Sequence, residues 1–239
     1  MDKSHPQVKF GKTGILLINL GTPSSTSWWD IRKYLKEFLS DKRVIEVNPI
    51  LWKIILNLFI LTFRPSKTAK AYKEIWMKEE NISPLLYYTR EQAKKISSTF
   101  TDENLIIDFA MRYGNPSIKI GLRKLMESGV DELLLLPMFP HHAQATTETA
   151  LKHAYRELKD LGWQPNIIEM GNFQTDDNYI APLAGSIEPH LDDDTHLLFS
   201  YHGLPVSHVK RVDKSKKHCQ KVDGCCSISC DANELCYGH

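Results

Sequence analysis

The sequence predicts an α/β protein built on a mostly parallel sheet. Short apolar runs of strand length, bounded by Gly, Pro and other turn residues, alternate with longer segments whose apolar residues recur every three or four positions. This alternation is typical of βαβ units, in which helices connect parallel strands. We therefore expect helices to cover the sheet, and the carboxyl ends of its strands to form the edge where a ligand binds.

The first strand is predicted over Gly14–Gly21, and it ends in a turn that contains Pro23. Apolar residues at helical spacing follow between Ser27 and Leu39, so a helix is expected there. A single glycine beside a proline does not match the GxGxxG pattern of dinucleotide-binding loops. We therefore exclude a dinucleotide site at this turn.

A second helix is predicted to begin at Asn48, with Pro49 in its first turn, and to end at Pro65. Its apolar run, Ile50–Phe63, includes Lys53 and Asn57 and is shorter than the about 20 apolar residues that a membrane-spanning helix needs. The run is apolar nearly all round, so it is either a core helix or the rim of an apolar pocket.

The remaining elements continue the same alternation. Helices are expected over 69–76, 85–98, 117–128, about 146–161 and 179–191, and strands over 105–111, 132–136, 166–170 and 196–200. The boundary between two similar domains is expected near Gly162–Pro165, which gives a first domain over 13–163 and a partial second domain over 164–239.

Composition limits the function classes. The chain has 239 residues, of which 42% are hydrophobic, so it has enough apolar residues for one or two folded domains. The formal net charge of +1 gives no support for a nucleic-acid partner, and the locally basic stretch Lys210–Lys221 lacks interleaved aromatic residues. The polar start, Met1–Pro6, is not followed by a signal-peptide pattern, so a cytoplasmic location is expected.

His202 is the most informative candidate for a functional residue. It follows the apolar run Leu197–Phe199 and precedes Gly203 and Pro205, which places it at the carboxyl end of a predicted strand. Histidine changes charge near neutral pH and is also a common metal ligand. Proton transfer, metal binding and a purely structural role therefore all remain open for His202.

Two further loops follow predicted strands. Arg112 and Tyr113 follow the strand over 105–111, and they offer a planar cation and a flat ring that would suit a large aromatic acid. The alternative is that Arg112 pairs with a structural aspartate. The second of these loops contains His141 and His142. Adjacent side chains diverge, so joint metal ligation by both is not expected.

All five cysteines lie in the segment 219–239, which we call the cysteine segment: Cys219, Cys225, Cys226, Cys230 and Cys236. Such clustering in a reducing compartment favours metal or iron–sulfur ligation over a disulfide framework. The spacing C-x5-C-C-x3-C-x5-C matches neither zinc ribbons nor the common ferredoxin patterns. A [2Fe-2S] cluster, a zinc ion and a metal-free redox loop all remain open.

Five sequence motifs resemble those of the ferrochelatase family. They occur in the family order and are GILLINLGTP (14–23), SPL (83–85), MRYGNPS (111–117), LPMFPHHAQATT (136–147) and SYHGLP (200–205). The resemblance extends from about residue 13 to residue 239. It implies two Rossmann-like, chelatase-type domains with parallel sheets, of which the second is incomplete here, and a porphyrin cleft between them.

The resemblance also assigns roles to particular residues. His202 matches the family histidine at the centre of the macrocycle, which acts as proton acceptor or as ligand of Fe2+. Residues Asn19 and Leu20 match the loop that faces the macrocycle, and the run Ile50–Phe63 matches the hydrophobic lip of the pocket. Four further residues match the pocket lining: Tyr72, Ser83, Arg112 and Tyr113.

The implied reaction inserts ferrous iron into protoporphyrin IX, the last step of haem biosynthesis. The pocket would bend the planar macrocycle, and a neutral imidazole near pH 7 would accept the pyrrole protons or help to strip ligands from the iron. Several bacterial members carry a [2Fe-2S] cluster in the region of the cysteine segment, which favours that cofactor. The lip implies peripheral contact with the inner membrane face.

Family members are longer than this chain. The additional part contains a glutamate that is expected to face His202, so the chain is interpreted as an amino-terminal fragment. The alternatives are a coproporphyrin or cobalt chelatase, and a non-catalytic relative that binds porphyrin or senses redox state.

Overall fold

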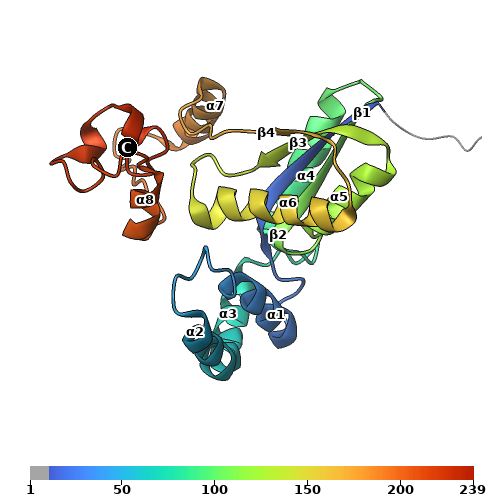
Figure 1. The fold of residues 1–239 in the computed structure, drawn as a ribbon, viewed down its shortest axis with the longest axis horizontal. Coiled ribbons are helices and arrows are strands. Elements are labelled where there is room, and N and C mark those ends of the chain that lie inside the picture. Colours follow the sequence, from blue (N-terminus) through green and yellow to red (C-terminus); the bar gives the residue numbers. More distant parts are fainter. Residues whose placement is uncertain (1–10) are drawn as a thin grey trace, which may run out of the picture. The chain divides into compact units, whose positions relative to one another are not determined.

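A four-stranded parallel sheet organises the first part of the chain in the computed structural model, which describes residues 11–239. Its strands are β1 (Lys12–Thr22), β2 (Leu105–Gly114), β3 (Val130–Pro137) and β4 (Asn166–Glu169). They lie in the order β2-β1-β3-β4, and every neighbouring pair is parallel (Figure 1). The predicted α/β class with a parallel sheet is therefore confirmed.

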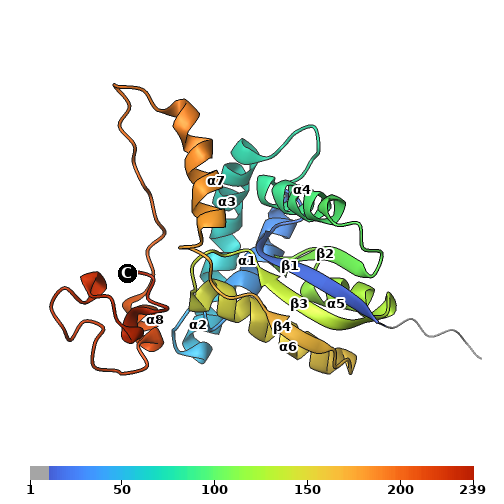
Figure 2. The same cartoon turned by 90° about the horizontal axis from the view of Figure 1, so that it is seen from above.

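Helices cover both faces of this sheet. Helix α4 (Pro84–Thr99) lies on one face, and α5 (Ile118–Glu127) and α6 (Thr149–Leu161) lie on the other (Figure 2). Before α6, residues Gln144–Glu148 form one π-helical turn. The side chains between the layers are fully buried and come mostly from the strands: Leu16, Leu17, Ile18, Leu133 and Leu135. This two-sided burial explains why the strands are continuously apolar in sequence.

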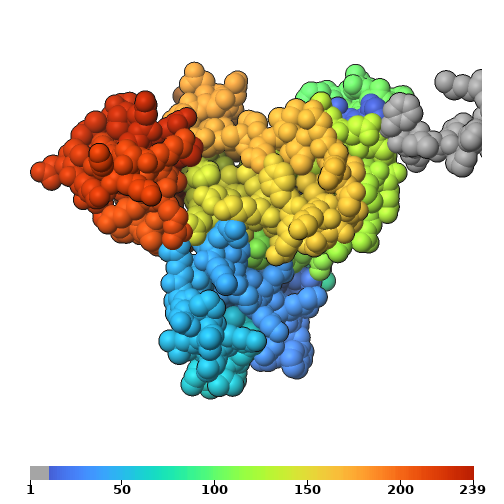
Figure 3. All heavy atoms as spheres, in the orientation of Figure 1, coloured from blue at the N-terminus to red at the C-terminus, as the bar shows by residue number. Residues whose placement is uncertain are grey.

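A helical lobe, residues 28–75, is inserted between β1 and α4. It contains α1 (Trp28–Leu39), α2 (Pro49–Ile55), the π-helical turn η1 (Leu56–Ile60) and α3 (Leu61–Ile75). The space-filling view shows it as the blue-to-cyan projection beside the sheet layers (Figure 3). Aromatic rings join the lobe to the sheet, because Phe38 packs edge-on against Tyr113 of β2 with ring centroids 5.0 Å apart.

The prediction that a helix ends at Pro65 is wrong, because α3 continues through this residue. Proline lacks the N–H that would bond to the carbonyl of Leu61, four residues earlier. That carbonyl instead accepts a 3.2 Å hydrogen bond from Arg32 Nε on α1. A tertiary contact therefore satisfies the carbonyl that the proline leaves without its helical hydrogen bond.

The apolar run Ile50–Phe63 forms a rim and not a core helix. Only Leu56 and Leu61 are buried among its apolar residues, whereas Ile50 is 75% and Phe63 71% exposed. We call the exposed apolar side chains of this run the lip: Ile50, Leu51, Ile54, Leu58, Phe59 and Phe63. No helix among residues 11–239 is long and apolar enough to cross a membrane.

The boundary between the two compact units differs from the predicted one. The first unit comprises residues 11–138 and Ala145–Met170, and the second comprises Phe139–Gln144 and Gly171–His239. The predicted domains, 13–163 and 164–239, placed residues 166–170 at the start of the second domain. In the structure β4 pairs with β3 of the first sheet instead, so the boundary shifts to Gly171.

The second unit contains short helices joined by irregular segments. Its elements are α7 (Asp177–Ile187), η3 (Glu188–His190), α8 (Val206–Val212), η4 (Cys225–Ser227) and η5 (Asp231–Asn233). The prediction of a strand over 196–200 is wrong. No neighbouring strand pairs with this segment in the described chain, and its side chains are exposed, Leu198 by 80% and Phe199 by 67%. Without such a partner, an apolar sequence does not form a strand.

The polar start at Met1–Pro6 lies outside the described residues, so the structure does not bear on the location that it predicts.

Candidate functional site

Arg112 and Tyr113 lie at the carboxyl end of β2, beside the end of β1. The parallel register sets Tyr113 next to Gly21, and both residues precede the loops that leave the sheet. The backbone at Gly21 has a φ of 113°, and a Cβ at this position would lie 1.8 Å from the Tyr113 carbonyl oxygen. Glycine is therefore required where the two strands approach the site.

Arg112 and Tyr113 both contact Asp41, which lies in the loop after α1. Arg112 Nη2 donates a 2.5 Å hydrogen bond to Asp41 Oδ2, and the Tyr113 hydroxyl donates to the same oxygen at 3.0 Å. Thr149 at the start of α6 accepts from Arg112 Nε at 2.8 Å and donates to Asp41. The structure therefore matches the alternative in which Arg112 pairs with a structural aspartate.

The ionisation of this cluster follows from its contacts. Burial alone would raise the pKa of Asp41, but hydrogen bonds from Thr149 and the Arg43 N–H, together with the Arg112 charge, hold its pKa below the usual value. Burial raises the pKa of Tyr113, so its hydroxyl remains a donor to Asp41. Asp41 is thus a carboxylate at neutral pH and fixes the Arg112 guanidinium in one orientation.

A basic groove of about 630 Å³ opens beside this cluster. Six of its lining residues are Lys or Arg, against two carboxylates, so an anionic group would be favoured there. The lining consists of Lys33, Lys36, Glu37, Ser40, Asp41, Lys42, Arg43, Arg112, His153 and Arg156.

His153 is the histidine of the groove wall and is uncharged at neutral pH. Burial and the charges of Arg112 and Arg156 lower its pKa to about 4, so the ring is uncharged at neutral pH. Its Nε2 lies 3.4 Å from Glu157, but this contact is not an ion pair when the ring is neutral.

Asn19 and Leu20 lie on β1 near the same sheet edge. Asn19 Nδ2 donates to Thr89 Oγ1 on α4 at 3.0 Å, and Asn19 Oδ1 accepts from the Leu20 N–H at 2.8 Å. The buried Ser83 accepts from the Leu86 N–H and acts as the N-cap of α4, so it has a structural role in addition to the expected pocket role.

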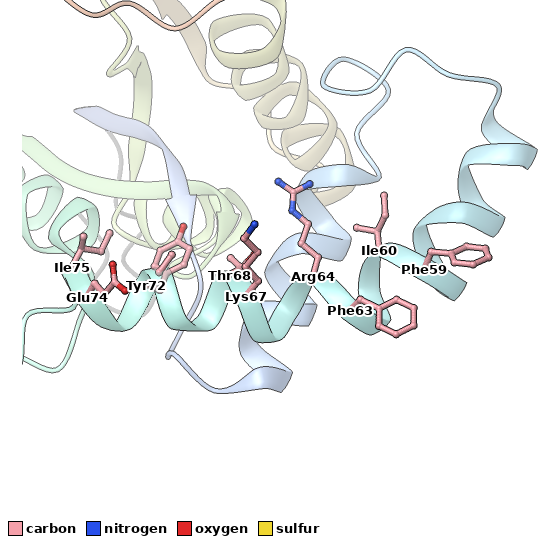
Figure 4. Close-up of a pocket in the computed structure, with 10 residues that line it drawn as sticks. Phe59, Ile60, Phe63, Arg64, Lys67, Thr68, Tyr72, Glu74 and Ile75 are labelled. Atoms are coloured by element: carbon pink, nitrogen blue, oxygen red, sulfur yellow. The ribbon is translucent and has the colours of Figure 1, made fainter.

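A second groove, of about 940 Å³, runs along α3 in the helical lobe. One end is apolar and includes Phe59 and Phe63 of the lip, and Tyr72 lies toward the other end (Figure 4). Arg64 and Lys67 extend from the same side of α3 between these aromatic residues. The groove therefore offers flat apolar contacts together with two cations, which suits a planar ring system that carries carboxylates.

His202 lies in an exposed loop of the second unit, residues 200–205, which we call the His202 loop. Its Nδ1 lies 2.7 Å from the Gly203 carbonyl oxygen. A carbonyl only accepts hydrogen bonds, so Nδ1 carries the proton in this contact, and Nε2 of the neutral ring keeps its lone pair. The exposed Nε2 is therefore available to accept a proton or bind a metal.

His141 and His142 also belong to the second unit. The His141 ring lies between the rings of Tyr201 and Tyr237, with centroid distances of 6.4 and 5.1 Å. His142 lines a small cavity with His208 and Leu235. The two side chains occupy different surroundings, as expected for adjacent residues, and do not share one site.

The cysteine segment brings some of its thiols close together. Cys225 and Cys226 have their Sγ atoms 3.9 Å apart, and a Cβ added at Gly238 would lie 3.3 Å from Cys226 Sγ and 4.0 Å from Cys236 Sγ. Cys230 lies instead against the His218 ring, at 3.8 Å from Nε2. Within residues 11–239, no three side chains of metal-binding type converge on one point.

Neighbouring thiols in the cysteine segment raise the pKa of Cys219 and of Cys226. Burial and the nearby thiols of Cys225 and Cys236 raise the pKa of Cys219, and the hydrogen bond with Cys225 raises the pKa of Cys226. A bound cation reverses this preference, because coordination deprotonates a thiol. The donor set therefore fits a metal centre in chemistry, although its side chains are not closed around one.

Asp213 organises the start of the cysteine segment. Its carboxylate accepts from the backbone N–H groups of Ser215, Lys216, His218 and Cys219, the last at 2.9 Å. The Ser215 hydroxyl also donates to it, and these hydrogen bonds lower the pKa of Asp213. The Asp213 carboxylate therefore holds the backbone N–H of Cys219 in place.

Sequence reasoning did not identify several of these residues. Asp41 and Thr149 contact Arg112 from 71 and 37 positions away, and no local pattern connects them. Arg64 and Lys67 had a weak signal, since they are three residues apart on a helix that also carries aromatic residues. The pattern Asp213-Lys214-Ser215 is typical of a side-chain-capped turn and would have pointed to Asp213.

Comparison with known proteins gives consistent matches. A family model described as Ferrochelatase matches residues 12–234. A protein named ferrochelatase from Agrobacterium fabrum (strain C58) is 44% identical over 224 residues, which cover 92% of this chain and 65% of that protein.

Two further relatives carry the same name. The protein from Allorhizobium ampelinum is 45% identical over 227 residues, covering 93% of this chain and 66% of the relative. The protein from Francisella tularensis subsp. tularensis (strain WY96-3418) is 44% identical over 218 residues, covering 90% and 65%. The chain thus spans 65–66% of the length of these relatives.

Proposed function

Because this chain belongs to the ferrochelatase family, we propose that the protein inserts ferrous iron into protoporphyrin IX to form protohaem. In this reaction Fe2+ is a substrate, four Fe–N bonds form, and two pyrrole N–H protons are released. The protein must therefore bind a planar tetrapyrrole, accept protons and deliver iron. The relatives that suggest this activity are named ferrochelatase, and this chain spans about two thirds of each, as given above.

The observation that carries the proposal is the orientation of the His202 ring. The 2.7 Å contact with the Gly203 carbonyl keeps the proton on Nδ1 and the lone pair on Nε2. Nε2 then accepts a pyrrole proton, or binds the iron as it loses water. Either step uses the neutral imidazole.

The groove along α3 is the proposed seat of the porphyrin. The macrocycle would lie against Phe59, Phe63 and Tyr72, and its carboxylates would pair with Arg64 and Lys67. This arrangement separates the apolar ring from its charged periphery, as an amphipathic ligand requires. Tyr72 has the pocket-lining role that the family resemblance implies.

Five residues are proposed to support the same pocket from the sheet edge: Asn19, Leu20, Ser83, Arg112 and Tyr113. Arg112 and Tyr113 act through the cluster with Asp41, which holds both side chains in fixed orientations. Ser83 acts by anchoring the start of α4.

We also propose that the cysteine segment holds a [2Fe-2S] cluster. Four thiols that interact electrostatically with one another would be its ligands: Cys219, Cys225, Cys226 and Cys236. Of these, Cys225 and Cys226 are in direct contact, whereas Cys230 lies against the His218 ring. When bound, the cluster supplies a one-electron redox centre and four bonds that cross-link a segment with little regular structure. Iron and sulfide analysis, with absorption spectroscopy, tests this assignment; stoichiometric zinc without colour contradicts it.

The lip is proposed to touch the surface of a membrane while the protein remains cytoplasmic. Its exposed apolar side chains lie beside the cations Arg64 and Lys67, a combination that suits an interfacial helix. Flotation with vesicles that contain anionic lipid is expected to recover the protein. Replacing Ile50 and Phe63 with serine is expected to leave it in the soluble fraction.

The activity itself is tested with the purified protein under anaerobic conditions. Protoporphyrin IX, coproporphyrin III and uroporphyrin are each offered with Fe(II), Co(II) or Zn(II), and product formation is followed by the change in visible absorption. We expect protohaem formation to have the highest kcat/KM of the Fe(II) reactions. A preference for coproporphyrin or for cobalt contradicts the proposed substrate, and porphyrin binding without metallation contradicts the proposed catalysis.

A further inference from the structure

The His202 loop has few restraints of its own. Residues 196–204 form neither helix nor strand in the described chain, and the Tyr201 side chain is 68% exposed. The His202 ring contacts the carbonyl of its own neighbour, Gly203, which orients the ring but does not fix the loop. Contacts from other segments of the second unit must therefore determine where this loop lies.

One such contact joins Tyr201 to His141. Their rings meet edge-on at 82° with centroids 6.4 Å apart. The backbone next to His141 is itself anchored, because the Phe173 N–H donates to the Pro140 carbonyl at 3.0 Å. Tyr201 immediately precedes His202, so a restraint on the Tyr201 ring also restricts the backbone of the His202 loop.

A second ring holds His141 from the cysteine segment. The Tyr237 ring lies at 54° to the His141 ring, with centroids 5.1 Å apart. Tyr237 follows Cys236 directly, and both residues line one cavity with His141, Tyr201 and Cys230. An unbroken series of ring contacts, Tyr237–His141–Tyr201, therefore connects the cysteine segment to the residue before His202.

We propose that His141 and Tyr237 are positioning residues for the His202 loop, so that the cysteine segment helps to hold the catalytic histidine in place. The inference rests on the catalytic role proposed above for His202. It gives the cysteine segment a function in the iron-insertion reaction that does not require electron transfer. It also explains why an aromatic residue stands directly after Cys236.

The test compares Tyr237→Ala with Tyr237→Phe in the purified protein. Alanine removes the ring that supports His141, whereas phenylalanine retains it. Tyr179→Ala is the control, because Tyr179 packs edge-on against Phe173 in the same unit and is not among the residues that line the cavity with His141, Tyr201 and Tyr237. Three readouts are measured: amide hydrogen exchange over residues 197–204, the rate of His202 modification by diethyl pyrocarbonate, and kcat and KM for iron insertion.

We expect Tyr237→Ala to increase amide exchange and the modification rate severalfold, and to lower kcat about tenfold with KM for porphyrin unchanged. Tyr237→Phe and Tyr179→Ala should match the wild type in all three. His141→Ala should reproduce the effect of Tyr237→Ala, and the double variant should be no worse than either single variant, because both act through one contact series.

Unchanged exchange over 197–204 in Tyr237→Ala overturns the proposal, whatever the activity. Equal effects of Tyr237→Phe and Tyr237→Ala also overturn it, since the ring contact is then irrelevant. If the wild type lacks chelatase activity but the exchange results are as expected, the proposed function fails and the coupling of the two segments stands.

Discussion

Arg112 on β2 and Asp41 after α1 form a hydrogen-bonded ion pair of 2.5 Å across 71 positions of sequence. The side chains are 10% and 5% exposed, so the pair is nearly removed from water. It connects the helical lobe to the carboxyl edge of the sheet, and Tyr113 and Thr149 bond to the same carboxylate.

Asp41→Asn is expected to destabilise the first unit by about 3 kcal/mol, because the buried Arg112 loses the nearer of its two carboxylate partners, Asp41 and Glu37. The free energy of unfolding from urea titration measures the effect. The control is Asp160→Asn, at an exposed position of α6, which should change the stability by less than about 0.5 kcal/mol. Equal stability of the two variants would show that the pair contributes nothing.

His153 is expected to make stability depend on pH between about 4 and its ordinary value of 6.5. Its folded-state pKa is depressed, so in this range the unfolded chain binds a proton that the folded chain does not, and stability falls as pH falls. Allowing for partial exposure, the loss at pH 5 is about 1 kcal/mol. Urea titrations of His153→Gln and wild type at pH 7 and pH 5 should show a smaller pH dependence in the variant.

Gly21→Ala is expected to lower the stability by more than about 3 kcal/mol, since the added Cβ would overlap the Tyr113 carbonyl and the φ of 113° is strained for alanine. Gly171→Ala is the matched control, because a Cβ there meets no atom within 4 Å. Thermal unfolding of both variants measures the difference. A Gly21→Ala protein as stable as the control would mean that the strands separate at this point.

Arg64→Ala and Lys67→Ala are each expected to weaken porphyrin binding by up to about tenfold, because each removes a partner for a carboxylate. Lys70→Ala, at an exposed position of α3 outside the groove, should leave the Kd unchanged. Titration of protein fluorescence with protoporphyrin IX measures the affinities. Equal Kd values for all three variants would exclude the α3 groove as the porphyrin seat.

The sequence was sufficient to predict the sheet and its covering helices. The runs that form β1, β2 and β3 are apolar because helices bury both faces of each strand. Such runs can be recognised from the local sequence alone. Ser83 and Ser117 cap α4 and α5 where their sequences indicate helix starts.

The predictions from sequence are wrong where a residue distant in sequence determines the local structure. Pro65 remains within α3 because Arg32 satisfies the carbonyl that proline leaves free. The apolar run over 196–200 has the sequence of a strand but no partner strand in the described chain. The contacts of Asp41 with Arg112 and of Tyr237 with His141 likewise depend on residues far apart in sequence, so no local pattern reveals them.

Single-turnover iron insertion by His202→Ala tests the catalytic role of His202 most directly. The control is His196→Ala, at an exposed position six residues earlier in the same unit. We expect His202→Ala to bind protoporphyrin IX with the wild-type Kd but to form protohaem at least about 100-fold more slowly, while His196→Ala reacts at the wild-type rate. Protohaem formation by His202→Ala at the wild-type rate would contradict the catalytic role of His202.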